Sequence, residues 1–563
     1  MLNCICFAQN IDEIQFILKK TNKKPTVIPL DLGAQLYCIY NKIEFIDPKN
    51  LIKNSFHFNT IKESYHLLNN LNYNDVLHES HQKELKAFVR FRFHLIAFLK
   101  EIVDQLKLLK KIDEIILSGW DHYYDTYSEK NYFISHIILD LVDDIKITTL
   151  NKISHKDFSD NFIYDYNLKN NLNNKEEYIF LTNLGYNFFR IVLTLFKNDK
   201  KILTPLNKIS FLKKIIYNLL GVEFIEFEKK KNQKKNQIEL PIIDFKYMGK
   251  DISKILNFRI DQEKKNIINL INKSYVINEL FQKFKIRFVI TNITRGIFGY
   301  FIDAAKNFKI SSMCIPHGTL SKNFDQFDQI YKKTISEAIT SKNAKFNVSQ
   351  SDISKKFYEQ NKNDYNKIIH TGNLIFSKSN KKKRKKRKIR KLLFAVTVKN
   401  LQSIQLLGVE MYYEFIDNLF FLDNFSKKNN FDVLIKLHPG VYKELPLLEK
   451  IFPNLEFSKK NISKIFDKSF VTISYSSTAI EDSLNSSCPV ILLDRWKRYK
   501  HCNAETNVDK KNSAVYYVNN ENDLLKCLET IAVSEKSNFS NFVNIEDNKK
   551  NMNSFINEYI LKK

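Results

Sequence analysis

Short apolar runs alternate with longer amphipathic segments along most of the chain. Residues 25–30 and 114–117 have the apolar character of buried strands, and residues 85–111 carry apolar side chains at helical spacing between them. This alternation is typical of βαβ units, which build parallel sheets. The pattern therefore predicts an α/β protein.

The middle of the chain departs from this alternation. From residue 176 to residue 228 the pattern is helical and apolar, which predicts a helical insertion at about residues 150–280. Strand-like runs then return at 288–291, 312–315 and 367–370. We assign residues 1–376, including the insertion, to an N-terminal Rossmann-like domain.

A second set of strands follows a basic linker at residues 377–391. Its apolar runs lie at 392–396, 432–437, 470–473 and 490–493. Residues 392–530 are expected to form a second Rossmann-like domain, and residues 531–563 a helical tail that packs back on the first domain. The predicted fold is α/β, with two Rossmann-like domains facing across a cleft.

Composition supports a large globular protein. The chain has 563 residues, of which 44% are hydrophobic and 13% aromatic, enough apolar material for two or three packed cores. The seven cysteines form no CxxC pair, which argues against a zinc module or a disulfide framework and favours a reducing, cytoplasmic setting. The N-terminus lacks the features of a signal peptide, and no apolar run approaches the roughly 18 residues of a membrane span.

The formal net charge is 89 − 62 = +27, and much of it is local. From Lys381 to Lys391 every residue except Ile389 is basic, and a second basic cluster lies at 229–235. Such runs are usually solvated linkers, and the alternatives are contact with anionic lipid at the inner face of the cell membrane or with nucleic acid. No aromatic RNA-binding strand motif accompanies them, so nucleic acid is not expected.

Unusual polar residues follow directly after predicted strands of both domains. His317 follows 312–315, His438 follows 432–437, and Ser476 and Ser477 follow 470–473. Ligands of open α/β sheets bind beyond the carboxyl ends of the strands. These residues predict a site in the cleft between the domains.

The serine-rich segment has a helix-start pattern. Ser477 or Thr478 is a natural N-cap for a helix that begins near Ala479, and Glu481 stands at capping-box distance from Thr478. The same arrangement suits a diphosphate, because free backbone N–H groups face the helix N-terminus. A well-capped helix without a ligand is the alternative.

Two histidines have surroundings that suit catalysis. Pro439 ends the strand before it and fixes His438 beside Lys436, where the imidazole can donate to a phosphate or ribose oxygen. Gly318 is expected to leave room for a ligand beside His317, which can remove a proton from an acceptor hydroxyl. Each histidine has the alternative of a structural hydrogen bond.

These elements resemble the GT-B capsule and teichoic-acid transferases, namely the CDP-glycerol glycerophosphotransferases and the bacterial sialyl-, polysialyl- and Kdo-transferases. The resemblance spans residues 288–494 and rests on these segments: Pro316-His317-Gly318-Thr319, Thr371-Gly372-Asn373, Lys436-Leu437-His438-Pro439 and Ser476-Ser477-Thr478 with Glu481. The chain departs from the glycerophosphotransferases at Leu320, where they have proline, and at Ser474, where they have aspartate.

The resemblance implies roles for individual residues and no bound metal or cofactor. His317 would be the catalytic base and His438 would contact the donor phosphate. The expected nucleotide and phosphate contacts are Lys436, Ser476, Ser477, Thr478 and Glu481, the last at the ribose. Further donor or acceptor contacts are expected from Gly318, Thr319, Thr397 and Lys399. Asp121 is a candidate on other grounds, because its loop follows the strand-like run at 114–117 and either shapes the acceptor side or only packs against the core.

The expected function is therefore a metal-independent glycosyltransferase of cell-surface polysaccharide biosynthesis, with a CMP- or CDP-linked donor and a polysaccharide or lipid-linked acceptor. A CDP-glycerol-type glycerophosphotransferase is the first alternative. A sugar-nucleotide epimerase would need acid and base carboxylates in the cleft, where this sequence offers histidines and hydroxyls. A basic nucleic-acid or lipid-surface binding protein is the alternative from another class.

Overall fold

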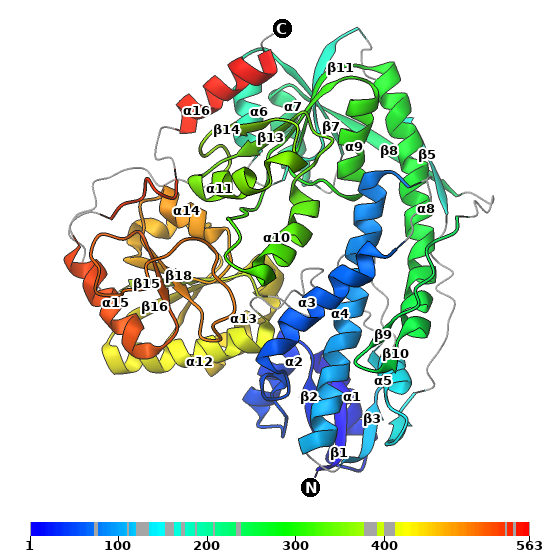
Figure 1. The fold of residues 1–563 in the computed structure, drawn as a ribbon, viewed down its shortest axis with the longest axis vertical. Helices are drawn as coiled ribbons and strands as arrows, with labels where there is room; N and C mark the ends of the chain where they lie inside the picture. Colours follow the sequence, from blue (N-terminus) through cyan, green and yellow to red (C-terminus); the bar gives the residue numbers. More distant parts are fainter. Residues whose placement is uncertain are drawn as a thin grey trace.

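The computed structural model describes residues 2–71, 77–109, 112–119, 134–151, 163–169, 175–185, 188–206, 209–231, 238–376, 391–398, 411–534, 537–543 and 548–561. Strands within these ranges form three largely parallel sheets and one short antiparallel pair, β9 (Lys246–Tyr247) with β10 (Lys250–Asp251). Figure 1 shows the three sheets in separate parts of the molecule, with α4 (Glu79–Leu109) between them. The α/β prediction with parallel sheets is confirmed.

The first sheet is built from the N-terminal residues in the order β2-β1-β3-β4. Its strands are β1 (Leu2–Ala8), β2 (Thr26–Pro29), β3 (Ile112–Leu117) and β4 (Lys146–Thr149). The nearby helices are α1 (Ile11–Lys20), α2 (Leu32–Asn41), η1 (Pro48–Asn50), α3 (Asn54–Asn69) and α5 (Ile134–Leu141). Alternate side chains face opposite sides of each strand, so Cys6 and Ala8 pack with α1 and α2, while Ile5 and Phe7 share a core with α4.

The second sheet has eight strands in the order β14-β13-β12-β11-β6-β7-β8-β5, and β5 pairs antiparallel with β8. Its strands are β5 (Tyr164–Lys169), β6 (Glu177–Leu181), β7 (Lys201–Pro205), β8 (Val222–Lys231), β11 (Lys285–Thr291), β12 (Ser311–Cys314), β13 (Phe346–Ser349) and β14 (Ile368–His370). Its helices are α6 (Phe189–Phe196), α7 (Phe211–Leu219), α8 (Ser253–Lys283), α9 (Gly296–Asn307), α10 (Gln326–Ile339), α11 (Asp352–Gln360) and η2 (Lys362–Asp364).

The predicted helical insertion at about residues 150–280 is wrong. This segment supplies β5, β6, β7 and β8, half of the eight-stranded sheet. β6 and β7 are buried on both faces, so their apolar runs are nearly continuous and lack the alternation of a half-exposed strand. The long helix α8 covers one face of the sheet together with α9, because residues of both share a core with Phe180 and Val289.

The third sheet contains six parallel strands in the order β17-β16-β15-β18-β19-β20. Its strands are β15 (Lys391–Ala395), β16 (Asp432–Lys436), β17 (Glu456–Ser458), β18 (Val471–Ser474), β19 (Val490–Leu493) and β20 (Val515–Val518). Its helices are α12 (Tyr412–Asn429), η3 (Pro439–Glu444), α13 (Leu445–Ile451), η4 (Ile462–Lys464), η5 (Phe466–Lys468), α14 (Ala479–Asn485) and α15 (Glu521–Val533).

Two sets of contacts join these parts of the chain. The first sheet shares one hydrophobic core with the third, and Tyr412 of α12 donates a hydrogen bond of 2.8 Å to the carbonyl oxygen of Pro29. At the other end of the chain, α16 (Asn548–Phe555) and the π-helical turn η6 (Ile556–Leu561) return to the eight-stranded sheet, where Ile556 is fully buried with Phe288. Residues 1–376 thus contain two sheets, and the first of these belongs to the core of the C-terminal part.

Candidate functional site

Polar side chains gather at the carboxyl ends of β6 and β11 in the eight-stranded sheet. Thr182 donates a hydrogen bond of 2.9 Å to Thr291, and the amide of Asn183 donates one of 2.6 Å to the side-chain oxygen of Asn292. The Nδ1 atom of His317, in the loop after β12, lies 2.8 Å from the backbone carbonyl oxygen of Asn292. The residue that follows β11 therefore fixes the orientation of the His317 imidazole.

The hydrogen bond of His317 defines its tautomer. A carbonyl oxygen only accepts, so Nδ1 carries the proton and the lone pair is on Nε2. Burial lowers the pKa of His317, and the nearby Arg295 guanidinium lowers it further. The half-buried ring is therefore neutral at neutral pH and has its basic nitrogen at Nε2.

Arg295 and Glu84 form a second layer beside this histidine. Arg295 precedes α9, and its Nε atom lies 3.8 Å from a carboxylate oxygen of Glu84 on α4. Burial raises the pKa of Glu84 to about 7 against the opposing effect of Arg295. Sequence reasoning missed both residues, because nothing in the sequence indicates that α4 packs against α9.

The glycine after His317 is less constrained than expected. The backbone of Gly318 is not left-handed, and a Cβ atom there would meet only Ile339, at an ordinary 3.6 Å. Gly318 and Thr319 line a small cavity together with Ile339 and Phe357. The backbone turn therefore does not require glycine at this position, and the room for a ligand beside His317 stays a prediction.

Hydroxyl groups meet at the carboxyl ends of β15 and β18 in the six-stranded sheet. Thr397 donates a hydrogen bond of 3.4 Å to Ser477, and Ser477 accepts one of 3.3 Å from the backbone N–H of Ala479. Ser474 donates to the carbonyl oxygen of Ala395 at 2.6 Å, which ties the two strand ends together. Ser476 is half-buried in the same turn.

The helix α14 begins at Ala479 as predicted, and of the two predicted caps it is Ser477 whose hydroxyl accepts the N–H of this first helical residue. Thr478 is exposed and its side chain makes no capping hydrogen bond, and Glu481 does not reach back toward it. The carboxylate of Glu481 is fully buried and accepts a hydrogen bond of 3.3 Å from Nε2 of His501. Its other oxygen, Oε2, has no hydrogen-bond partner among the described residues.

His438 begins the turn η3, directly after β16 and Leu437. Its Nδ1 atom accepts a hydrogen bond of 3.2 Å from the backbone N–H of Gly440, so in the neutral ring Nε2 carries the proton. The ring is exposed. Lys436 is half-buried, which lowers its pKa, and its ammonium group donates to the carbonyl oxygen of Leu437 at 2.5 Å.

The two large sheets meet through their helices. Arg190 of α6 interacts electrostatically with Asp482 of α14, and its guanidinium donates a hydrogen bond of 2.6 Å to the carbonyl oxygen of Phe376. Tyr331 of α10 packs edge to face against Tyr499, with ring centroids 5.5 Å apart. The carboxyl ends that carry His317 and Ser477 thus belong to domains in direct contact.

Some predicted residues lie outside the described ranges. Asp121 and Lys399 are among them, as is the basic tract except for Lys391, which begins β15 and pairs with Glu456. Within the described ranges, no group of three or more His, Cys, Asp or Glu side chains has an arrangement that could hold a metal ion. The same ranges contain no helix with the length and apolarity needed to cross a bilayer.

No protein-family model matches the chain, and neither does any curated protein. Similar solved structures include the UDP-GlcNAc 2-epimerase of Methanocaldococcus jannaschii, at 14% identity and a TM-score of 0.40 over 68% of this chain and 98% of that one. The UDP-GlcNAc 2-epimerase of Neisseria meningitidis bound to UDP-GlcNAc matches at 14% identity and 0.38, over 69% and 99%. Anabaena HepE in complex with UDP and glucose matches at 9% and 0.39, over 69% and 99%. The fold assignment rests on the sheets described above.

Proposed function

We propose that this protein is a GT-B-type transferase that moves a sugar or polyol-phosphate unit from a nucleotide-activated donor to a saccharide acceptor. The observation that carries the proposal is a pair of imidazoles with opposite tautomers at the carboxyl ends of two sheets whose domains touch. Transfer needs a base on one substrate and hydrogen-bond donors on the other. Because these motifs resemble those of the capsule and teichoic-acid transferases, we propose that the reaction belongs to the biosynthesis of a cell-surface polysaccharide. For the same reason we propose a donor activated by a cytidine nucleotide.

The six-stranded sheet would bind the donor. The hydroxyl of Ser477, which accepts from Thr397, and the Nε2–H group of His438 are donors suited to phosphate oxygens. The buried Oε2 atom of Glu481 lacks a partner among the described residues, and leaving such an atom unpaired is costly. A ribose hydroxyl would supply the missing donor.

The eight-stranded sheet would bind the acceptor. Nε2 of His317 takes the proton of an acceptor hydroxyl, and the oxygen attacks the donor carbon or phosphorus atom. The bond from that atom to the nucleotide phosphate oxygen breaks, and its electron pair leaves on the nucleotide. His438 and the hydroxyls stabilise the negative charge that develops there.

Nucleotide binding tests the proposal before any acceptor is known. The protein is heated with CMP, CDP, UDP, GDP or a nucleotide sugar, and the melting temperature is compared with that of the ligand-free protein. A nucleotide at a hundredfold excess over its dissociation constant stabilises by about 2.7 kcal/mol, which raises the melting temperature by several degrees. If no nucleotide shifts the melting curve and the protein instead binds RNA with steep salt dependence, the basic nucleic-acid alternative replaces the transferase.

A further inference from the structure

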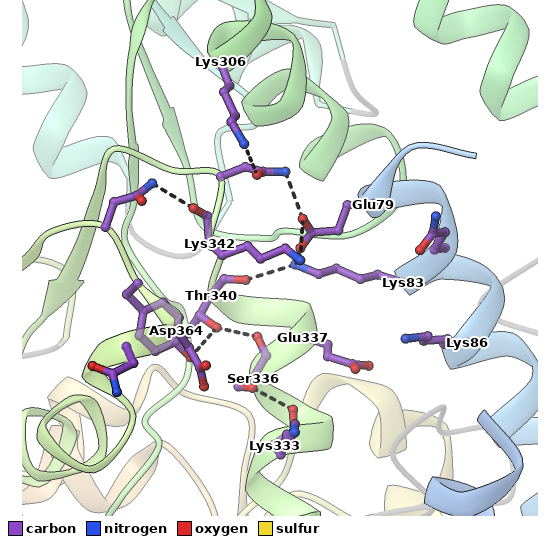
Figure 2. Close-up of a pocket in the computed structure, with 15 residues that line it drawn as sticks. Glu79, Lys83, Lys86, Lys306, Lys333, Ser336, Glu337, Thr340, Lys342 and Asp364 are labelled. Carbon is purple, nitrogen blue, oxygen red and sulfur yellow. Dashed lines mark hydrogen bonds and ion pairs between the residues drawn. The ribbon is translucent and has the colours of Figure 1, made fainter. Parts of the chain in front are cut away.

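A polar pocket of about 580 Å³ lies between α4, α9 and α10, and the function proposed above does not use it (Figure 2). Five lysines line it from three helices and the loop after α10: Lys83, Lys86, Lys306, Lys333 and Lys342. The carboxylates in its wall are Glu79, Glu337 and Asp364. The pocket therefore brings together more positive than negative side chains.

The carboxylates of the wall are shared among several cations. Glu79 lies 3.0 Å from the ammonium group of Lys83 and 3.6 Å from that of Lys342. Glu337 lies 3.2 Å from Arg90, which is not part of the lining. Because like charges in one concave site repel each other and focus the field, an anion entering the pocket would be attracted and would relieve the repulsion.

The rest of the lining suits hydroxyl groups. The neutral polar residues are Gln82, Ser336, Thr340, Asn343, Asn363, Tyr365 and Asn366. Side-chain amides donate and accept at once, as a saccharide hydroxyl requires. Asn343 is already satisfied within the protein, since it donates to Glu79 at 3.0 Å and to Asp303 at 2.8 Å and accepts from Lys306 at 2.9 Å. The amide oxygens that can accept from a saccharide hydroxyl are those of Gln82, Asn363 and Asn366. The ligand indicated by this lining is both anionic and rich in hydroxyls.

The pocket adjoins the acceptor side of the candidate site. Thr340 lines this pocket and also the small cavity that contains Gly318 and Thr319. The backbone carbonyl of Glu337 accepts a hydrogen bond of 3.0 Å from Thr294, in the loop that also carries Asn292. A saccharide acceptor whose reacting hydroxyl lies at His317 could therefore place a charged group among the lysines of this pocket.

We infer that this pocket binds a negatively charged saccharide and anchors the acceptor of the transferase at a distance from the reacting hydroxyl. The assignment of this saccharide as the acceptor rests on the proposed function, whereas its binding does not. The charge on the saccharide is a carboxylate or a phosphate, because ammonium groups bind either as point charges.

Calorimetric titration of the full-length protein tests the inference with trigalacturonate, mannose 6-phosphate and neutral maltotriose as probes. The variant with Lys86→Gln and Lys306→Gln is compared with Lys254→Gln, which removes one lysine charge from the exposed surface of α8. We expect one charged probe to bind, and the double variant to weaken that binding at least tenfold. The Lys254→Gln protein should bind it within twofold of the wild type, and maltotriose should bind at least tenfold more weakly than the charged probe.

Three results would overturn the inference. Charged saccharides could bind equally well to the wild type and the double variant, or not at all, or inorganic phosphate could bind as tightly as mannose 6-phosphate. Nucleotide melting shifts measured on the same proteins separate this inference from the proposed function. If a nucleotide still raises the melting temperature but no saccharide binds, only the saccharide-binding inference is contradicted. If a saccharide binds but no nucleotide raises the melting temperature, only the proposed transferase function is contradicted.

Discussion

The Nδ1 atoms of His317 and His438 make opposite kinds of hydrogen bond. That of His317 donates to the carbonyl oxygen of Asn292, whereas that of His438 accepts from the backbone N–H of Gly440. Backbone groups thus leave the lone pair of one ring and the proton of the other on Nε2. One ring is prepared to take a proton and the other to donate a hydrogen bond.

Replacing His317 should separate chemistry from donor binding. We expect His317→Ala to lower kcat for transfer by about 10²- to 10⁴-fold, because it removes the general base. The dissociation constant of the nucleotide should stay within about twofold, since the donor groups lie on the other sheet. Rates come from a coupled assay of nucleotide release and affinities from titration. Loss of nucleotide binding in this variant would contradict the role of base.

The pH dependence of kcat/KM should report the same group. Burial lowers the pKa of His317, so the base remains neutral below its ordinary value of 6.5 and is protonated only at more acidic pH. Activity should therefore persist as the pH falls through 6.5 and be lost below it. The rate is measured from pH 4.5 to 8, with residual folding checked by circular dichroism at each point. An acid limb centred above pH 6.5 would show that another group controls the rate.

Much of the fold follows from local pattern. The strand β19 (Val490–Leu493) was predicted with its observed bounds, and β12 (Ser311–Cys314) was predicted one residue late, because turn residues flank both apolar runs. The apolar pattern did not identify β6 and β7 as strands. Between them lies α6 (Phe189–Phe196), and a strand buried on both faces has the same continuous apolar character as a buried helix.

The site was only partly predictable. His317 and Ser477 could be recognised because chemically distinctive residues follow strands, and ligands of parallel sheets bind at that edge. Glu84 could not, because it reaches the site only through the packing of α4 against α9. The predicted capping box of Glu481 failed for a related reason, since His501 competes for the carboxylate.

Glu481 should distinguish ribonucleotides from deoxyribonucleotides. We expect Glu481→Gln to weaken ribonucleotide binding about tenfold, because the acceptor Oε2 that a ribose hydroxyl would use becomes an amide or is turned away. Binding of the matching deoxyribonucleotide should change less when the 2′-hydroxyl is the partner. Titration of CDP and 2′-deoxy-CDP against both proteins measures the difference. Equal weakening of the two ligands would mean that Glu481 acts through the fold around His501 or through the 3′-hydroxyl.

Glu13 should make the stability of the first sheet depend on pH. Burial raises its pKa from 4.5 to about 7, although it accepts hydrogen bonds from Ser118 and from the backbone N–H of Gln9. Between pH 4.5 and 7 the folded state therefore holds a proton on Glu13 that the unfolded state releases. The contribution of this group to the free energy of unfolding is fully present below pH 4.5 and is lost as the pH rises through 7. The loss amounts to about 3 kcal/mol from this group.

Glu13→Gln keeps the shape and removes this titration. An amide can still accept from the Gln9 N–H group and donate to the Ser118 hydroxyl. From pH 5 to pH 8 we expect the melting temperature of the variant to fall less than that of the wild type. Buried Glu84 and Glu414 also have pKa values raised to about 7, and they titrate in both proteins, so the difference isolates Glu13. Glu449→Gln on the exposed surface of α13 is the control, and it should melt in parallel with the wild type at both pH values. A parallel fall for Glu13→Gln would mean that Glu13 is already ionised in the folded protein at pH 5.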